Sequence, residues 1–160
     1  MKGLPFSAVQ LSLRAAVAAS LAVATAGALG LPAPLYAMIA AVIVTDLVPG
    51  RSRELAVPRL LGTLLGTATG GLLVPIMHAG PWMIGVGVLV AMLLAHGLRL
   101  RGAEKLAGYV CAIVLLEHPG EAWTYAVHRC LETAVGIAAA VAVSLVPKLA
   151  GGTSSPPEDP

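Results

Sequence analysis

Apolar residues form long runs along this chain, and short breaks rich in Gly, Pro and charged residues separate them. The runs lack the strict alternation of apolar and polar residues that marks a half-buried strand. Their lengths suit α-helices, and Pro-Gly or Gly-Pro pairs mark several of the ends. The pattern predicts six helices, at about residues 7–30, 34–48, 54–76, 81–98, 104–117 and 121–146.

The composition places these helices in a membrane. Hydrophobic residues make up 58% of the 160 residues and charged residues 11%, whereas soluble domains carry about 25% charged residues. Arg14 interrupts the first run and argues against a cleaved secretory signal. We therefore predict an all-α integral membrane protein with six transmembrane helices within residues 1–148 and a disordered cytoplasmic tail at 149–160.

The basic residues predict how the helices are oriented. Those outside the apolar runs fall at the two termini, between the second and third helices and between the fourth and fifth. The other three connections contain no Lys or Arg. Cytoplasmic loops carry an excess of Lys and Arg, so both termini are predicted to lie in the cytoplasm. The residues that carry this prediction are Lys2, Arg51, Arg53, Arg99, Arg101, Lys105 and Lys148.

Other kinds of chemistry find little support in the sequence. The net charge of +2 is too small to favour nucleic acid as a partner. The four histidines share no metal-ligand spacing, and Cys111 and Cys130 lie in apolar helical runs as small hydrophobic residues. No motif joins a nucleophile to a base. We therefore expect no metal, no cofactor and no enzymatic activity.

The second half of the chain repeats the first at an offset of seventy residues. Each copy holds three helices, an odd number, so the second copy must enter the membrane from the opposite side. The sequence predicts two inverted repeats, at about residues 7–77 and 81–147, an architecture typical of secondary transporters. The offset relates Pro49, Gly50, Ala56, Val57, Arg59, Thr63 and Gly66 to Pro119, Gly120, Ala126, Val127, Arg129, Thr133 and Gly136.

Arg59 and Arg129 are the leading candidates for function. A charge near the middle of a bilayer costs about 2.5–3.5 kcal/mol on insertion scales, so it is usually retained for a reason. Three explanations stay open. The side chains reach the headgroups, or they form ion pairs (Arg129 with Glu132, Arg59 with Asp46), or they capture an anion through the planar guanidinium.

Neighbouring residues on the same two helices extend this candidate site. Thr63 and Thr133 either bond carbonyls of their own helices or add hydroxyl groups to an anion site. Small residues at helical spacing predict that the third and sixth helices approach closely, and the positions are Gly62, Gly66, Gly70 and Gly136.

Two acidic residues are candidates for proton coupling. Asp46 and Glu132 lie closest to the apolar zone, and a buried carboxyl favours its neutral form. Asp46 is also consistent with a simple interfacial position at the end of the second helix. Glu132 stands where the first repeat has Gly62, so this position is where the two copies differ in chemistry.

The two arginine motifs resemble those of the fusaric acid resistance and aromatic acid exporter superfamily. They are Gly50-Arg51 followed by Arg59-x-x-Gly62-Thr63-x-x-Gly66, and Arg129-x-x-Glu132-Thr133-x-x-Gly136. The resemblance covers about residues 8–147, and the plant aluminium-activated malate channels are more distantly similar. Typical members carry a large cytoplasmic domain after the helices, which 160 residues do not accommodate. The resemblance implies a six-helix bundle acting in efflux of small, often aromatic, carboxylic acids, as a homo-oligomer.

These observations predict a membrane exporter of small organic anions. Arg59, Thr63, Arg129, Glu132 and Thr133 are predicted to bind the substrate. The predicted partners are the lipid bilayer, the organic anion and further copies of the chain, with a dimer favoured. Two alternatives stay open: a channel-like anion pathway, and a non-transporting membrane module that scaffolds another protein.

Overall fold

The structure, a computed structural model, describes residues 6–76, 80–117 and 122–146. These residues form six α-helices and short connections between them, which confirms the predicted all-α architecture. The predicted tail at 149–160 lies outside the described residues. The helices are α1 (Phe6–Ala28), α2 (Pro34–Val44), α3 (Pro49–Leu73), α4 (Pro81–Gly97), α5 (Glu104–Glu117) and α6 (Ala122–Leu145).

The start of α3 differs most from the predicted boundaries. The helix begins at Pro49 and not near residue 54. Proline suits the first helical position, because its φ is already helical and its missing N–H would have no partner there. The predicted basic loop therefore forms the first turns of α3, where Arg51 and Arg53 are exposed. Correspondingly, α2 ends at Val44, and Thr45 follows in an extended conformation.

Pro58 lies inside α3, whereas the sequence predicts it within the first turn or so. An interior proline donates no helical hydrogen bond, so the carbonyl of Glu54, four residues earlier, loses that donor. Gly102, in the connection between α4 and α5, lies beside the Pro58 ring. This contact brings the α4–α5 connection next to Arg59.

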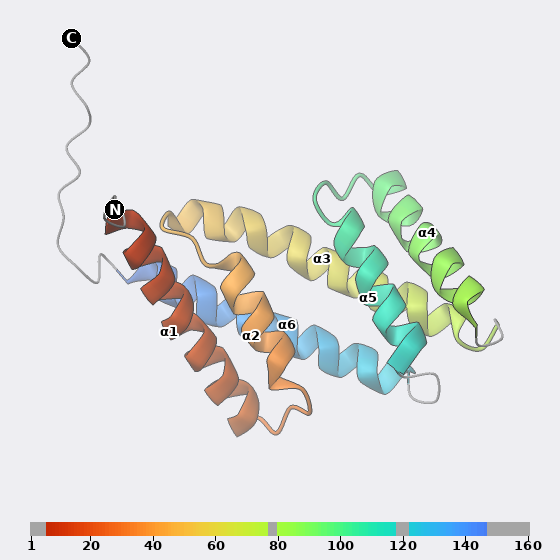
Figure 1. The fold of residues 1–160 in the computed structure, drawn as a ribbon, viewed down its shortest axis with the longest axis horizontal. Helices are drawn as coiled ribbons and strands as arrows, with labels where there is room; N and C mark the ends of the chain where they lie inside the picture. The colour runs from red at the N-terminus through yellow and green to blue at the C-terminus, as the bar shows by residue number, and fades with distance from the viewer. Residues whose placement is uncertain (1–5, 77–79, 118–121, 147–160) are drawn as a thin grey trace, which may run out of the picture.

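The two longest helices, α3 and α6, form the centre of the bundle. In Figure 1, α3 and α6 run across the molecule, with α1 and α2 at one end and α4 and α5 at the other. The central helices pack against each other, and each also packs against one flanking pair: α3 against α4 and α5, and α6 against α1 and α2.

Glycines allow the closest helix contacts, but not between the helices that the sequence predicts. A Cβ at Gly66 would lie 2.6 Å from the carbonyl oxygen of Ala107, and a Cβ at Gly136 would collide with the carbonyl oxygen of Ala37. The glycines of α3 thus allow α5 to pack closely against it, and Gly136 of α6 allows the close approach of α2. The expectation that these glycines bring α3 and α6 together is wrong, because the short helices α5 and α2 occupy the glycine faces.

The rest of the α3 ridge behaves in the same way. Gly62 and Gly70 also face side chains of α5, each within 3 Å of where a Cβ would be. The contact between α3 and α6 involves other positions, among them the Thr67 hydroxyl, which lies 3.7 Å from the Cys130 thiol.

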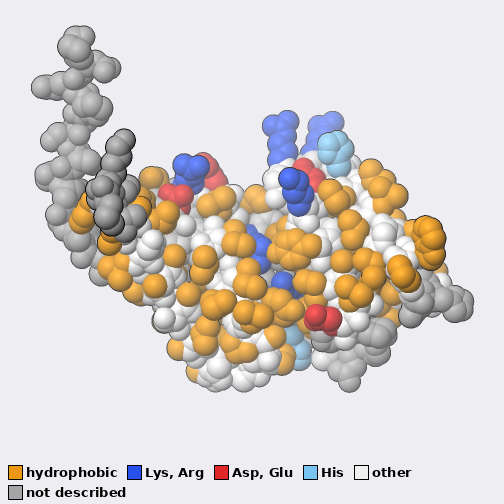
Figure 2. Space-filling model, in the orientation of Figure 1, with side chains coloured by type: hydrophobic (Ala, Val, Ile, Leu, Met, Phe, Trp, Pro, Cys, Tyr) orange, Lys and Arg blue, Asp and Glu red, His pale blue; other side chains and the backbone are white. Residues whose placement is uncertain are grey.

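The outer surface of the bundle is apolar. Hydrophobic side chains cover much of the face shown in Figure 2, while charged side chains gather along its upper edge. Exposed basic residues belong to the start of α3 and to the α4–α5 connection, namely Arg51, Arg53, Arg99, Arg101 and Lys105. Within the described chain, Phe6–Ala28 and Trp123–Leu145 are long and apolar enough to cross a membrane, and α2 and α4 are shorter apolar helices.

Candidate functional site

Arg129 is buried in the interior of the bundle, on the α6 face that meets α2. Its side chain is 2% exposed, and its Cζ lies 3.1 Å from the ring centroid of Tyr36. A guanidinium stacked on an aromatic face keeps its N–H groups free to donate around the ring edge. Nε and Nη1 find no hydrogen-bond partner among the described residues. Arg129 is therefore a buried cation with unused donors.

Arg59 is held differently by a tyrosine of α5. The side chain is 6% exposed, and Nη1 donates a hydrogen bond of 2.5 Å to the hydroxyl oxygen of Tyr109. Its Cζ lies 5.9 Å from the Tyr109 ring centroid. Nε again has no partner within the part of the chain that the structure describes. The Tyr109 hydroxyl accepts from Arg59 and keeps its own hydrogen for another acceptor.

The two threonines of the repeated motif are both buried but differ in bonding. The hydroxyl of Thr63 donates to the carbonyl oxygen of Arg59 at 2.9 Å, a local bond within α3. The hydroxyl of Thr133 is buried and makes no hydrogen bond to any described residue. Thr133 is thus the one of this pair with an available hydroxyl group.

Glu132 is bonded to the connection between α1 and α2. The side chain is 1% exposed, and Oε1 accepts a hydrogen bond of 2.8 Å from the backbone N–H of Ala33. Residue 33 precedes α2, whose first backbone N–H groups have no helical partner. Glu132 therefore anchors the start of α2 to the middle of α6.

Neither predicted ion pair forms between the described residues. Glu132 makes no ion pair with Arg129. Asp46 pairs instead with Arg51 at 3.6 Å, and its carboxylate also accepts from the N–H of Val48 at 3.1 Å. Asp46 thus stabilises the first turn of α3 at the edge of the bundle, apart from the buried arginines.

One cavity lies beside Arg59, and a second lies beside Glu132. The Arg59 cavity has a volume of about 310 Å³ and is lined by Ile43, Leu55, Pro58, Arg59, Gly102, Lys105, Leu106 and Tyr109. The Glu132 cavity has a volume of about 290 Å³ and is lined by Pro32, Ala33, Tyr36, Glu117, Tyr125, His128 and Glu132. Both volumes are at the lower end of the range for small-molecule sites.

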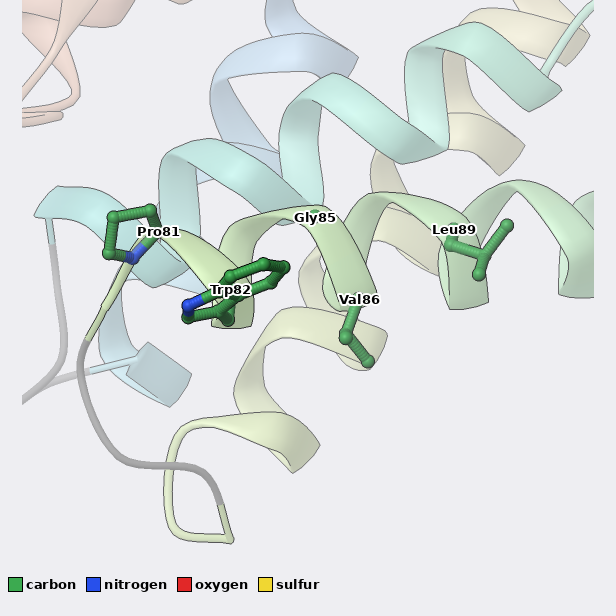
Figure 3. Close-up of a pocket in the computed structure, with 5 residues that line it drawn as sticks. All are labelled: Pro81, Trp82, Gly85, Val86 and Leu89. Atoms are coloured by element: carbon green, nitrogen blue, oxygen red, sulfur yellow. The ribbon is translucent and has the colours of Figure 1, made fainter.

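Two other hollows on the surface are apolar. One, of about 470 Å³, lies along a single face of α4 and is lined by Pro81, Trp82, Gly85, Val86 and Leu89 (Figure 3). The other, of about 450 Å³, is a groove between α3 and α6 that includes Thr67 and Cys130. Neither contains a charged side chain, so neither is suited to hold a small anion.

Sequence reasoning missed the aromatic partners of the arginines. The chain has three tyrosines. Tyr36 and Tyr109 each contact one buried arginine. The ring of Tyr125 packs edge-on against that of Tyr36, with 6.4 Å between the ring centroids. The presence of an amphipathic residue in three mostly aliphatic helices was a usable signal. The sequence did not indicate which tyrosine contacts which arginine, because these contacts depend on helix packing.

Arg14 is a third buried arginine, and it donates to two backbone carbonyls, although its Nε has no partner among the described residues. Nη1 donates to the carbonyl oxygen of Leu47 at 3.3 Å, and Nη2 donates to that of Val146 at 3.1 Å. These carbonyls follow α2 and α6, where helix ends leave acceptors without helical partners. Arg14 therefore ties α1 to two helix ends, which is a structural role.

Two helices long and apolar enough to cross a membrane, two shorter apolar helices and arginines buried at the helix contacts are typical of a helical membrane protein. The chain matches the Fusaric acid resistance protein family over residues 8–150, and it belongs to that family. The resemblance drawn from the two arginine motifs is thereby confirmed. Membership indicates a membrane efflux transporter. No curated protein and no solved structure matches the chain.

Proposed function

We propose that this protein exports small organic anions, aromatic carboxylates above all, across a bacterial inner membrane. The observation that carries the proposal is the state of Arg129. A guanidinium buried without a carboxylate partner is costly, because desolvation is not offset by an ion pair. Its stack on Tyr36 leaves two nitrogen atoms without partners in the described structure. A substrate carboxylate passing this point supplies the missing acceptor.

The proposed architecture has six transmembrane spans arranged as two inverted repeats. Its support is the equivalence of the closest helix contacts. Gly66 of α3 meets the carbonyl oxygen of Ala107 in α5, and Gly136 of α6 meets that of Ala37 in α2. Both members of the first contact stand at the offset of seventy from those of the second. A two-fold axis that relates the repeats accounts for this pairing.

The proposed orientation has both termini in the cytoplasm. The exposed basic residues at the start of α3 and in the α4–α5 connection support it, because such residues concentrate on the cytoplasmic side. In this orientation the Arg59 cavity opens toward the cytoplasm and the Glu132 cavity toward the outside.

In the proposed mechanism, Arg59 and Arg129 bind the carboxylate in succession. The Thr133 hydroxyl adds a donor beside Arg129, whereas Thr63 supports the α3 backbone at Arg59. Glu132 is the candidate for proton coupling, because it breaks the symmetry of the repeats and is buried. We also propose that the transporter works as a homo-oligomer, with a dimer favoured.

The test is benzoate flux in proteoliposomes that contain the purified chain. We expect Arg59→Ala and Arg129→Ala each to lower flux about tenfold or more, because each removes a charge-assisted contact. Lysine at either position keeps the charge but not the planar fork, so its flux should be intermediate. Arg53→Ala is the matched control, since Arg53 is an exposed cation of the same helix as Arg59.

Two results would contradict the proposal. One is wild-type flux that persists in both alanine variants, provided that gel filtration and circular dichroism show them folded. The other is a wild-type chain that carries no benzoate or related carboxylate and copurifies with another protein, which is the expectation for a scaffold module.

A further inference from the structure

The two cavities occupy equivalent places in the two repeats. Several lining residues of one stand seventy positions from lining residues of the other. Four pairs of lining residues are related by this offset, and the first member of each lines the Arg59 cavity while the second lines the Glu132 cavity. They are Gly102 with Pro32, Leu106 with Tyr36, Leu55 with Tyr125, and Pro58 with His128. The fold therefore builds one kind of hollow twice, once beside each repeated helix.

The charges that line the two cavities have opposite signs. Arg59 and Lys105 line the first, and the residues lining it include no carboxylate. Glu104 lies nearby in sequence, but it lines neither cavity and its Oε2 accepts from the backbone N–H of Gly102 at 2.9 Å. Glu117 and Glu132 line the second cavity, and its lining contains no Lys or Arg. The basic lining therefore attracts a carboxylate to the first cavity, whereas the lining of the second offers it no Lys or Arg.

The Arg59 cavity also offers the donors that a carboxylate needs. Arg59 lines the cavity, and its side chain is 6% exposed. Lys105 is exposed at the first turn of α5. The Tyr109 hydroxyl, which accepts from Arg59, has a hydrogen left to donate. Three donors of different kinds thus converge on one hollow.

The remaining walls suit the ring of a small aromatic acid. Ile43, Leu55, Pro58 and Leu106 supply aliphatic surface, and Tyr109 supplies an aromatic one. A volume of about 310 Å³ is sufficient for an aromatic ring with its carboxylate.

We propose that the Arg59 cavity is the loading site for small aromatic monocarboxylates. Arg59 and Lys105 bind the carboxylate, Tyr109 donates to it, and the aliphatic walls hold the ring. The Glu132 cavity is the release end, because its lining offers the anion no Lys or Arg. This inference rests on the proposed function, and it adds the place of loading and the direction that the charges favour.

The first experiment locates bound benzoate by protection of a single thiol. Cys111 and Cys130 are replaced by alanine, and Leu55→Cys then reports on the Arg59 cavity while Pro32→Cys reports on the Glu132 cavity. Labelling by N-ethylmaleimide is followed by mass spectrometry in detergent. With benzoate at ten times its Kd, labelling of L55C should slow about tenfold. Labelling of P32C should not change.

A second experiment measures benzoate affinity by equilibrium dialysis. Lys105→Gln should weaken binding about tenfold or more, because it removes a charged partner, and Lys105→Arg should preserve binding. Arg101→Gln is the matched control, since Arg101 is an exposed cation four residues before Lys105 that does not line the cavity.

Several outcomes would overturn the inference. Protection of P32C in place of L55C, equal protection of both thiols, or unchanged affinity in Lys105→Gln would each do so, even with wild-type flux intact. The proposed function fails in a different way. Its failure is the absence of benzoate flux from a wild-type protein in which benzoate still protects L55C.

Discussion

The Arg59 and Arg129 regions share one sequence motif and yet hold their guanidinium groups in different ways. Arg129 stacks on the face of Tyr36, whereas Arg59 donates to the hydroxyl oxygen of Tyr109. At the offset of seventy, Tyr36 corresponds to Leu106, which is one helical turn from Tyr109. Moving the aromatic residue by one turn on the flanking helix thus converts a stacked cation into a hydrogen-bonded one.

This difference indicates that positions related by the offset of seventy share helix contacts more strictly than they share chemistry. Gly66 and Gly136 make equivalent approaches to backbone carbonyls, because a helix crossing at such short range tolerates no side chain. The side chains that contact the two arginines differ. An aromatic residue can move by one helical turn on α2 or α5 without disturbing the close contact of that helix with α6 or α3. The shared contacts and the differing groups can be separated by mutation.

The largest effect should come from filling the shared contacts. Gly136→Val places a side chain against the carbonyl of Ala37, which is backbone and cannot move without shifting α2. We expect a loss of about 3 kcal/mol, at the upper end for overpacking, and Gly66→Val should behave alike. Unfolding by SDS in mixed micelles measures the loss.

Gly85→Val is the control for these variants, because a Cβ at Gly85 meets no atom within 4 Å. It changes an exposed face of α4 and should leave stability within about 0.5 kcal/mol. A stable Gly136→Val protein would show that α2 and α6 are not in close contact, and the equivalence of the two repeats would lose its main support.

The next largest effect should come from the position where the repeats differ. Glu132→Ala removes the acceptor for the N–H of Ala33 and leaves that group buried without its partner. We expect a loss of about 1–3 kcal/mol. Glu132→Gln keeps a side-chain oxygen in place and should retain most of the stability, which the same SDS titration can compare.

The glutamine variant also separates structure from coupling. If Glu132 only anchors the start of α2, then Glu132→Gln should transport benzoate at the wild-type rate with the wild-type dependence on pH. If Glu132 carries a proton, the folded glutamine variant should lose the stimulation of flux by a pH gradient. An equal loss of stability in both variants would contradict the anchoring role.

A smaller effect should follow from changing the stacked ring. Tyr36→Phe keeps the aromatic face under Arg129 and removes only the hydroxyl that is hydrogen-bonded to Tyr125, so it should cost less than a change that also removes the ring. Tyr36→Leu removes the face and should cost about 1–2 kcal/mol, the range for a desolvated cation–π contact. Equal stability of the leucine and phenylalanine variants would indicate that the stack contributes nothing beyond packing.

Much of this architecture could be predicted from the sequence. The apolar runs gave the helices to within a few residues, because an all-apolar run between Gly and Pro breaks has few alternative readings. The start of α3 was not predicted correctly. The polar sequence of residues 49–53 resembles a loop, although Pro49 suits a first helical position. Hydrophobicity alone does not distinguish these two cases.

The candidate site could be predicted only in part. Arg59 and Arg129 were identifiable, because buried charges are rare in apolar helices. Their partners were not identifiable, because Tyr36 and Tyr109 come from other helices and depend on the crossings that the glycines permit. The glycine pattern indicated close packing without naming the helix that packs there.

The smallest effect on stability should come from Tyr109→Phe. The Tyr109 side chain is 40% exposed, and its hydroxyl accepts one hydrogen bond from Arg59. Water replaces much of what the hydroxyl contributes at such a site, so we expect a loss below about 1 kcal/mol in the SDS titration. The same variant removes a donor from the Arg59 cavity and should weaken benzoate binding severalfold in equilibrium dialysis. Tyr36→Phe, the matched change at the other arginine, should leave benzoate binding unchanged, because the stack there uses the ring and not the hydroxyl. Equal weakening in the two variants would contradict the distinction between a hydrogen-bonded Arg59 and a stacked Arg129.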